Sequence, residues 1–209
     1  MDIQPITLNG RLTRLEPLSE VHIPDLDSAC KDSPDGKRTI WRYLLDSRVY
    51  RNEGMAGLVK ELMARQLAGS DLPFAIIDVK TGKAVGTTRF MEIEVDNRVV
   101  EIGTWIGLDF QRAGLNLESK YLMLRHAFAT LKAIRVQFKI DHRNFGSLDA
   151  IERIRAYREG ILRNHIILAD GTVRSSVYYS ILDSEWPAVE IHIQNLTARA
   201  PAEAVAVRT

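Results

Sequence analysis

The chain has 209 residues, of which 45% are hydrophobic and 26% charged, the balance of an ordinary globular protein rather than a disordered or fibrous one. A formal net charge of +1 provides no general attraction to nucleic acid or anionic membranes, so any anion site must be local. The lone Cys30 excludes an intrachain disulfide framework and a cysteine-based metal site, and it favours a reducing, cytoplasmic compartment. We expect no signal peptide and, without a run of about 18 apolar residues, no membrane span.

The first third of the chain predicts a strand followed by helical pieces. Residues 6–17 alternate in polarity around an Asn9-Gly10 turn, which indicates extended structure. Residues 19–45 are polar with scattered apolar side chains, and we expect short helices and loops there. Residues 55–67 carry apolar side chains at helical spacing, which predicts a helix that ends towards Gly69.

A change of period then marks a run of strands. Residues 73–79, 84–94 and 99–107 are extended, apolar segments. They are joined by Thr81-Gly82 and Asp96-Asn97, the short turns that are typical of hairpins. These segments predict an antiparallel meander.

The second half alternates helices and strands. A helix from Leu117 carries one apolar stripe and precedes an alternating strand at residues 134–140. A second helix follows at residues 144–157, with Asn144 or Ser147 as its cap.

A hairpin of residues 161–168 and 173–182 and a short helix near Pro187 end the fold. With no linker or repeat, we predict one domain over residues 1–196 and a frayed tail at 197–209. Its class is α/β, with a mixed sheet and helices on its faces.

One turn stands out because it joins an apolar strand directly to the long helix. Its residues are Gln111, Arg112, Ala113, Gly114, Leu115 and Asn116. The first turn of a helix has unpaired N–H groups and the positive end of the helix dipole, so this turn predicts a phosphate site. Taken alone, Gln-x-x-Gly-x-Asn is also compatible with an ordinary strand-to-helix loop.

The element order and this turn resemble the GNAT superfamily of acetyl-CoA-dependent N-acetyltransferases. The turn matches the family's (Arg/Gln)-x-x-Gly-x-(Gly/Ala) pattern, and the wider likeness, from about Ile6 to Trp186, is to the RimJ/RimL-type branch, which includes ribosomal-protein N-terminal acetyltransferases. Six further stretches carry the resemblance: Leu72-Pro-Phe-Ala75, Gly82-Lys-Ala-Val-Gly86, Glu101-Ile-Gly103, Asn144-Phe-Gly-Ser147, Arg158-Glu-Gly-Ile-Leu-Arg163 and Tyr179-Ser-Ile-Leu-Asp-Ser-Glu-Trp186.

The resemblance implies a mainly antiparallel mixed sheet with a V-shaped splay between two adjacent parallel strands. It implies that the turn 111–116 binds the diphosphate of acetyl-CoA and that Arg112 adds a charged contact. Backbone groups of Trp105, Ile106 and Gly107 would then bind the pantetheine, with Asn144 contacting CoA or capping its helix.

The resemblance also implies catalytic roles for two side chains. Glu101 corresponds to the strand position of a glutamate base in GNAT enzymes, although Glu92, Glu94 or a water molecule are alternatives. Ser147 corresponds to a serine that protonates the departing thiolate. Each has an ordinary alternative, because a strand carboxylate commonly faces solvent or pairs with a cation, and serine commonly caps helices.

The sequence departs from the family pattern at three places. Asn116 replaces the small residue at the end of the turn, and asparagine tolerates a positive φ better than most residues. The segment from Glu101 to Gln111 is one residue shorter than this branch leads us to expect. Arg155 replaces a helix-ending glycine, which costs roughly 1 kcal/mol if the left-handed conformation is kept.

We therefore predict an acetyltransferase that uses acetyl-CoA, needs no metal, and acts on a primary amine, either a peptide N-terminus or a small molecule, by direct attack in a ternary complex. The family also implies a homodimer. Two other functions remain open: a non-catalytic acyl-CoA-binding module, and a ribosome- or RNA-associated protein that uses an arginine cluster. That cluster comprises Arg153, Arg155, Arg158 and Arg163.

Overall fold

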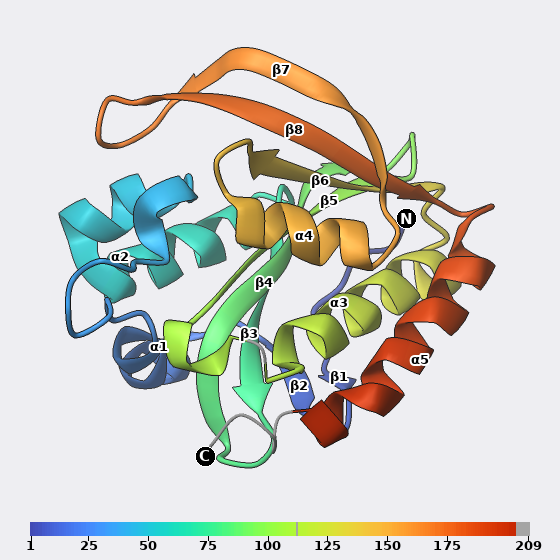
Figure 1. Ribbon diagram of the computed structural model, residues 1–209, viewed down its shortest axis with the longest axis horizontal. Helices are drawn as coiled ribbons and strands as arrows, with labels where there is room; N and C mark the ends of the chain where they lie inside the picture. The colour runs from blue at the N-terminus through green and yellow to red at the C-terminus, as the bar shows by residue number, and fades with distance from the viewer. Residues whose placement is uncertain (112, 204–209) are drawn as a thin grey trace.

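A computed structural model describes residues 1–111 and 113–203, which form an eight-stranded sheet in the order β1-β2-β3-β4-β5-β6-β8-β7 (Figure 1). The strands are β1 Leu8–Asn9, β2 Thr13–Pro17, β3 Leu72–Asp78, β4 Lys83–Glu94, β5 Val99–Ile106, β6 Arg135–Asp141, β7 Tyr157–Ile167 and β8 Val173–Leu182. The main helices are α1 Ile23–Ala29, α2 Ser47–Leu67, α3 Leu115–Arg125, α4 Phe145–Arg153 and α5 Trp186–Glu203.

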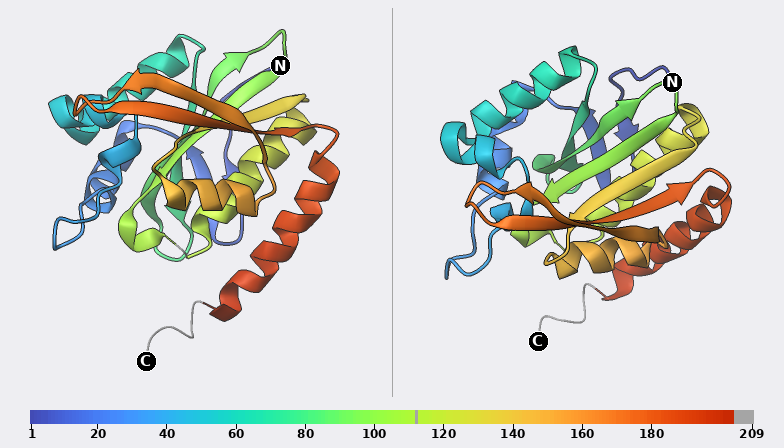
Figure 2. Two further views of the ribbon diagram at one scale, coloured as in Figure 1. Left: turned by 45° about the horizontal axis from the view of Figure 1, so that its top comes forward. Right: turned by 90° about the horizontal axis from the view of Figure 1, so that it is seen from above.

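Both faces of the sheet are covered by helices, because buried strand side chains point to both faces and the helices carry apolar stripes that pack on them. Along β3, Phe74 and Ile76 belong to the core shared with α3 and α5, whereas Ala75 and Ile77 belong to the core shared with α1 and α2. Successive strand side chains point to opposite faces, so one buried apolar strand serves both layers. Figure 2 shows α1 and α2 on one side of the sheet and α3 and α5 on the other. The mixed α/β fold class is confirmed.

The sheet divides between its two parallel strands. β5 and β6 pair through Val99↔Arg135, Val100↔Val136 and Glu101↔Gln137, and the pairing ends there. Beyond that point β5 stays paired with β4 as far as Ile106, and β6 stays paired with β8 as far as Asp141. Each half of the sheet is thus intact, while the two halves separate from Glu101 onward.

Helix boundaries differ from the sequence expectations for identifiable backbone reasons. α2 begins at Ser47 and bends at Gly54, whose φ of 68° suits glycine. α4 ends at Arg153, and Tyr157, which we expected in that helix, begins β7. α5 is longer than the short helix we expected and continues past residue 196 to Glu203.

A buried ion-pair cluster fixes the segment before α2 to the sheet. The Arg89 guanidinium on β4 donates to both Asp46 carboxylate oxygens at 2.7 and 3.1 Å, and its Nε lies 2.9 Å from Asp71 Oδ2. All three residues are buried. Because a buried charge is tolerated when it is paired and hydrogen-bonded, this cluster holds the Trp41–Asp46 segment beside β5.

The second residue after α4 carries the left-handed strain that the sequence suggested. Arg155 has a φ of 64°, and its side chain is exposed. We expect Arg155→Gly to raise the free energy of unfolding by about 1 kcal/mol, because glycine adopts this conformation without the Cβ clash. Urea denaturation measures the change, and Arg155→Ala is the control because it keeps the Cβ atom. An equal effect of both variants would contradict this explanation.

Candidate functional site

The two halves of the sheet separate toward an edge where four chain segments converge. β5 and β6 are parallel, so their carboxyl ends lie at the same edge. α3 follows β5 through a short turn at Leu108–Phe110, and α4 follows β6 directly, so both helices begin at this edge. A crevice at the carboxyl ends of separating parallel strands is a common place for ligands.

The first turn of α3 is left without a side-chain cap. Its N-cap is Gly114, which has a φ of 82°, a left-handed conformation that favours glycine. No side chain of the described residues bonds to the first N–H groups, so they are available to an anion. Asn116 lies inside the helix and has no positive φ, so the tolerance expected of asparagine is not needed there. Arg112 lies outside the described residues.

Two polar side chains flank this turn. Gln111 Nε2 donates to the Ile106 carbonyl oxygen at 3.5 Å, and its Oε1 accepts a 3.4 Å hydrogen bond from Arg38. The sequence had not singled out Arg38, which comes from the loop after α1. The buried Asn116 Oδ1 has no hydrogen-bond partner among the described residues.

The start of α4 assigns the cap to one of the two candidates. The Asn144 side chain accepts a 3.3 Å hydrogen bond from the Ser147 N–H and is the N-cap. Ser147 is half-buried in the first turn, and its hydroxyl is not needed as the cap.

The free edge of β5 offers backbone groups that are not used by β4. Gly107 donates its N–H to the Val85 carbonyl at 2.9 Å, on the β4 side. Since successive backbone groups of a strand alternate in direction, those of Thr104 and Ile106 face the β6 side, where pairing has ended. This register favours Ile106 over Trp105 as the backbone donor. A Cβ atom on Gly107 would overlap the Ala29 carbonyl, so that glycine permits the close approach of α1.

Glu101 occupies the closed end of the splay. The residue is 3% exposed, and burial raises the pKa of its carboxyl above the ordinary value despite two favourable partners. Those partners are Gln137, which donates to Oε2 at 3.2 Å, and Lys139, whose Nζ lies 3.4 Å from the same oxygen. A carboxyl group with a raised pKa can accept and release a proton nearer neutral pH.

The two competing carboxylates lie differently. Glu92 sits in a β4 bulge with a φ of 48°, and its Oε1 is 4.0 Å from Lys139 Nζ. Glu94 is exposed and accepts a 2.7 Å hydrogen bond from Asn97 in the following turn. Neither is buried beside the separating strands as Glu101 is.

An aromatic segment covers the Glu101 face of β5. The indole rings of Trp41 and Trp105 are 5.6 Å apart, and neither Nε1 has a hydrogen-bond partner within the described chain. The Tyr43 carbonyl accepts a 3.2 Å hydrogen bond from Arg174 on β8, which fixes this segment to the far half of the sheet. The sequence predicts loops and short helices for residues 41–45 but not these contacts, because their partners are distant along the chain.

The opposite face of β5 contains a buried lysine that sequence reasoning missed. Lys120 on α3 is 8% exposed and donates to the Thr104 hydroxyl, which is 2.7 Å from the Thr88 hydroxyl. Burial lowers the pKa of Lys120 to about 7, because no opposite charge compensates for the lost hydration. In the sequence, the only sign that Lys120 is buried is its position within the apolar stripe of the helix.

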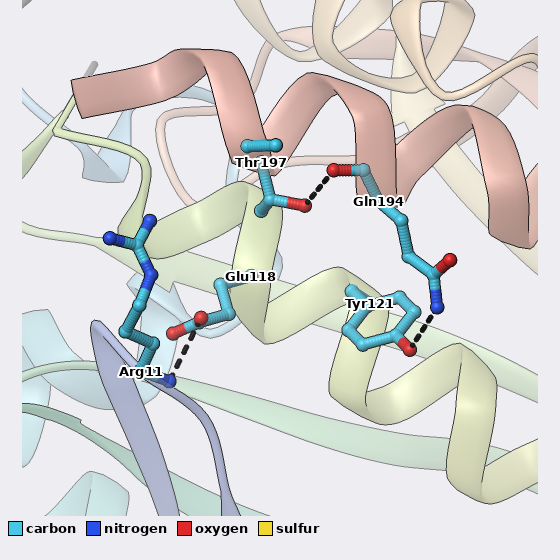
Figure 3. Close-up of a pocket in the computed structure, with 6 residues that line it drawn as sticks. Arg11, Glu118, Tyr121, Gln194 and Thr197 are labelled. Atoms are coloured by element: carbon cyan, nitrogen blue, oxygen red, sulfur yellow. Dashed lines mark hydrogen bonds between the residues drawn. The ribbon is translucent and has the colours of Figure 1, made fainter. Parts of the chain in front are cut away.

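Two cavities of the described residues lie away from this edge. One of about 280 Å³ lies between the β1–β2 turn, α3 and α5, where Figure 3 shows Glu118 bonded to the Arg11 backbone. Glu118 also accepts the N–H groups of Leu12 and Thr13 at 2.6 Å, so its carboxylate anchors this turn to α3. A second cavity of about 440 Å³ lies between residues 1–5 and the end of α2. Neither opens between β5 and β6.

Comparison with known proteins now identifies the fold. The family model described as Acetyltransferase (GNAT) domain matches residues 13–156, more than half of the chain. The chain belongs to the GNAT acetyltransferase family. A T. thermophilus protein of known crystal structure, assigned as an acetyltransferase, is 34% identical, with 94% of this chain and 99% of that chain covered and a TM-score of 0.82.

Two further relatives bear on the branch within the GNAT family. YdaF of Bacillus subtilis (strain 168), assigned as a ribosomal N-acetyltransferase, is 30% identical over 105 residues, or 50% of this chain and 57% of YdaF. Mycobacterium smegmatis RimJ, solved in complex with CoA-disulfide, shares the fold, with 19% identity, a TM-score of 0.77, and coverage of 93% of this chain and 96% of that chain. The resemblance to the GNAT family is confirmed, and these relatives support the likeness to its RimJ/RimL-type branch.

Within residues 1–111 and 113–203, no helix combines the length and apolar character needed to cross a bilayer. In the same residues, no group of three or more His, Cys, Asp or Glu side chains is arranged to hold a metal ion.

The buried amine of Lys120 predicts a pH-dependent cost to folding. Between pH 7 and 10 the unfolded chain binds a proton on Lys120 that the folded chain does not, so this group makes stability rise with pH. Replacing it by Lys120→Met should therefore stabilise the GNAT fold most near pH 7. The advantage should shrink by up to about 1.4 kcal/mol per pH unit towards pH 10.

Urea denaturation at several pH values measures this difference. Lys60→Met, at an exposed position of α2, is the matched control and should show no pH-dependent gain. A Lys120→Met advantage that stays constant from pH 7 to 10 would show that the amine is charged in the folded protein.

Proposed function

We propose that this GNAT enzyme transfers an acetyl group from acetyl-CoA to a primary amine by direct attack in a ternary complex. The single observation that carries the proposal is the separation of β5 from β6 immediately beyond Glu101, with an uncapped helix N-terminus at the open end. This arrangement supports an extended ligand whose anionic part lies at α3 and whose reactive end lies near Glu101. About six residues of strand, roughly 20 Å, separate the two ends.

The residues present fit the diphosphate of acetyl-CoA. The N–H groups from Ala113 to Leu117, including that of Leu115, offer donors at the positive end of α3. The Asn116 N–H belongs to this group of donors. Gln111 adds a side-chain amide. Arg112 stays a sequence-based proposal for a charged phosphate contact.

The middle of the proposed site is the free edge of β5. The N–H groups of Thr104 and Ile106 and the Thr104 carbonyl are available to the pantetheine amides, since they have no strand partner on the β6 side. Trp105 and Gly107 flank these groups, and Asn144 at the start of α4 borders the site from the other half of the sheet. A backbone N–H aimed at the thioester carbonyl would stabilise the charge that develops there.

The reacting end needs proton transfer in both directions. Acetyl-CoA supplies a thioester, whose carbonyl carbon forms a bond with the amine nitrogen while the C–S bond breaks. Glu101 would accept the proton that the ammonium must lose, directly or through water, and its raised pKa supports this role. Ser147 would donate a proton to the departing thiolate, whose reference pKa of about 8.5 makes this assistance useful rather than indispensable.

One of the relatives supports a class of acceptor. YdaF is assigned as a ribosomal N-acetyltransferase, which supports a protein N-terminus as the acceptor of this chain. The acceptor would approach from the Glu101 face, where the Trp41–Tyr43 segment and the β7–β8 hairpin lie across from each other. We also propose that the protein acts in the cytoplasm, in keeping with its single cysteine.

Calorimetry followed by a turnover assay tests the proposed function. Acetyl-CoA should bind with a stoichiometry of one, and free thiol should appear when peptides or small amines are added. Binding without turnover across such a panel would favour a non-catalytic acyl-CoA-binding module. No binding would contradict both functions and would turn attention to RNA binding by the exposed arginine cluster.

Glu101→Gln tests the base assignment separately. We expect turnover to fall by about 10²–10⁴-fold while the affinity for acetyl-CoA stays nearly the same, because Glu101 is at the reacting end rather than at the diphosphate site. Thiol release with saturating amine and calorimetry measure the two quantities. Turnover that survives the substitution would move the role to Glu92, Glu94 or water.

A further inference from the structure

A lysine from the neighbouring parallel strand holds the carboxylate at the closed end of the splay. Lys139 is on β6, two residues beyond Gln137, the last residue that pairs with β5. Its Nζ lies 3.4 Å from Glu101 Oε2, and the two side chains are only 10% and 4% exposed. The ion pair therefore spans the two strands just where their backbone hydrogen bonding ends.

Glu92 completes the cluster from the other side. The bulge between Met91 and Glu94 turns Glu92 out of the β4–β5 ladder, and its φ of 48° is rare for a residue with a side chain. As a result its Oε1 lies 4.0 Å from Lys139 Nζ. Lys139 thus has a buried carboxylate on one side and a carboxylate that is 59% exposed on the other.

The charged groups around Glu101 come from three strands. β4 supplies Glu92 and Arg89, β6 supplies Lys139, and β8 supplies Arg174. Arg89 is already neutralised by Asp46 and Asp71. Arg174 donates to two backbone carbonyls and to Ser176 Oγ, which fix it away from direct contact with Glu101. Lys139 is the one cation of the described residues in direct contact with the Glu101 carboxylate.

We infer that Lys139 is a positioning residue for Glu101. Lys139 orients the Glu101 carboxylate at the junction of β5 and β6. Together with Glu92, which has the opposite effect, it sets how readily Glu101 takes up a proton. This inference rests on the proposed role of Glu101 as the base. The neighbouring cation favours the charged carboxylate, whereas burial and Glu92 favour the protonated one. The same ammonium also disfavours a protonated acceptor amine beside it, which promotes the neutral form that reacts.

The two neighbours should move the same titration in opposite directions. In the pH profile of kcat/KM for an amine acceptor, Glu101 produces a break on the acid side, below the break that the acceptor amine itself produces. Lys139→Met removes the favourable charge and should move the Glu101 break to higher pH by about one unit. Glu92→Gln removes the unfavourable charge and should move it to lower pH.

Three further variants control for structural effects. Lys139→Arg keeps the cation and should restore the wild-type break. Asp96→Asn changes an exposed carboxylate in the turn after the same strand, and Lys83→Met removes an exposed lysine, so both should leave the break where it is. Thermal unfolding of every variant separates loss of fold from loss of proton control.

The outcomes distinguish this inference from the proposed function. Opposite shifts of the break for Lys139→Met and Glu92→Gln, with rescue by Lys139→Arg, would support the inference. An unmoved break in Lys139→Met, or shifts of both variants in the same direction, would overturn it. If Glu101→Gln retains turnover and the acid break, the base assignment fails and the inference fails with it, whereas the proposed acetyl transfer still stands.

Discussion

Everything proposed for this protein depends on where hydrogen bonding between β5 and β6 ends. Three residue pairs join these strands, and the last pair is Glu101↔Gln137. Each strand then keeps its outer partner, so neither half of the sheet loses its ladder. The backbone groups on the inner edges still require hydrogen bonds, because unpaired buried N–H and C=O groups are costly. A bound molecule with its own amides can satisfy them.

The separation also decides the character of the Glu101 side chain. A carboxylate at the last paired residue is buried by both halves of the sheet, yet lies beside the position where they diverge. Burial alone would drive it to the neutral form, and Lys139 across the junction opposes that tendency. Proton affinity at this place is thus a balance between two strands. The balance differs from that of Lys120 on the opposite face, where burial is uncompensated.

Local patterns predicted the fold well because its signals are local. The meander, the turn into α3 and the cap at Asn144 all depend on nearby residues, and the motif order indicated the family. Contacts between distant segments were not predictable in the same way. The pairing of Lys139 with Glu92 requires a β4 bulge, and the contact of Arg38 with Gln111 joins loops 73 positions apart. The alternation of polar and apolar residues along β6 placed Lys139 on the polar face of the strand, but it did not indicate which carboxylates Lys139 pairs with.

The glycines illustrate the same limit. Gly114 has a left-handed conformation that favours glycine, and it stands at the start of α3. For Gly107 the family resemblance implies a place in the pantetheine site, yet its missing side chain allows α1 to approach, and its N–H is used by β4. A glycine in a sequence marks a close approach without naming what approaches. Only the positions of distant elements show whether a glycine makes room for a ligand or for a neighbouring helix.

A crystal structure of the protein with acetyl-CoA tests the central claim most directly. We predict that the diphosphate lies against the N–H groups of Gly114–Leu117, the pantetheine along the free edge of β5, and the thioester near Glu101. A complex in which β5 and β6 close up, or in which the molecule occupies the cavity beside Glu118 and Arg11 instead, would contradict it.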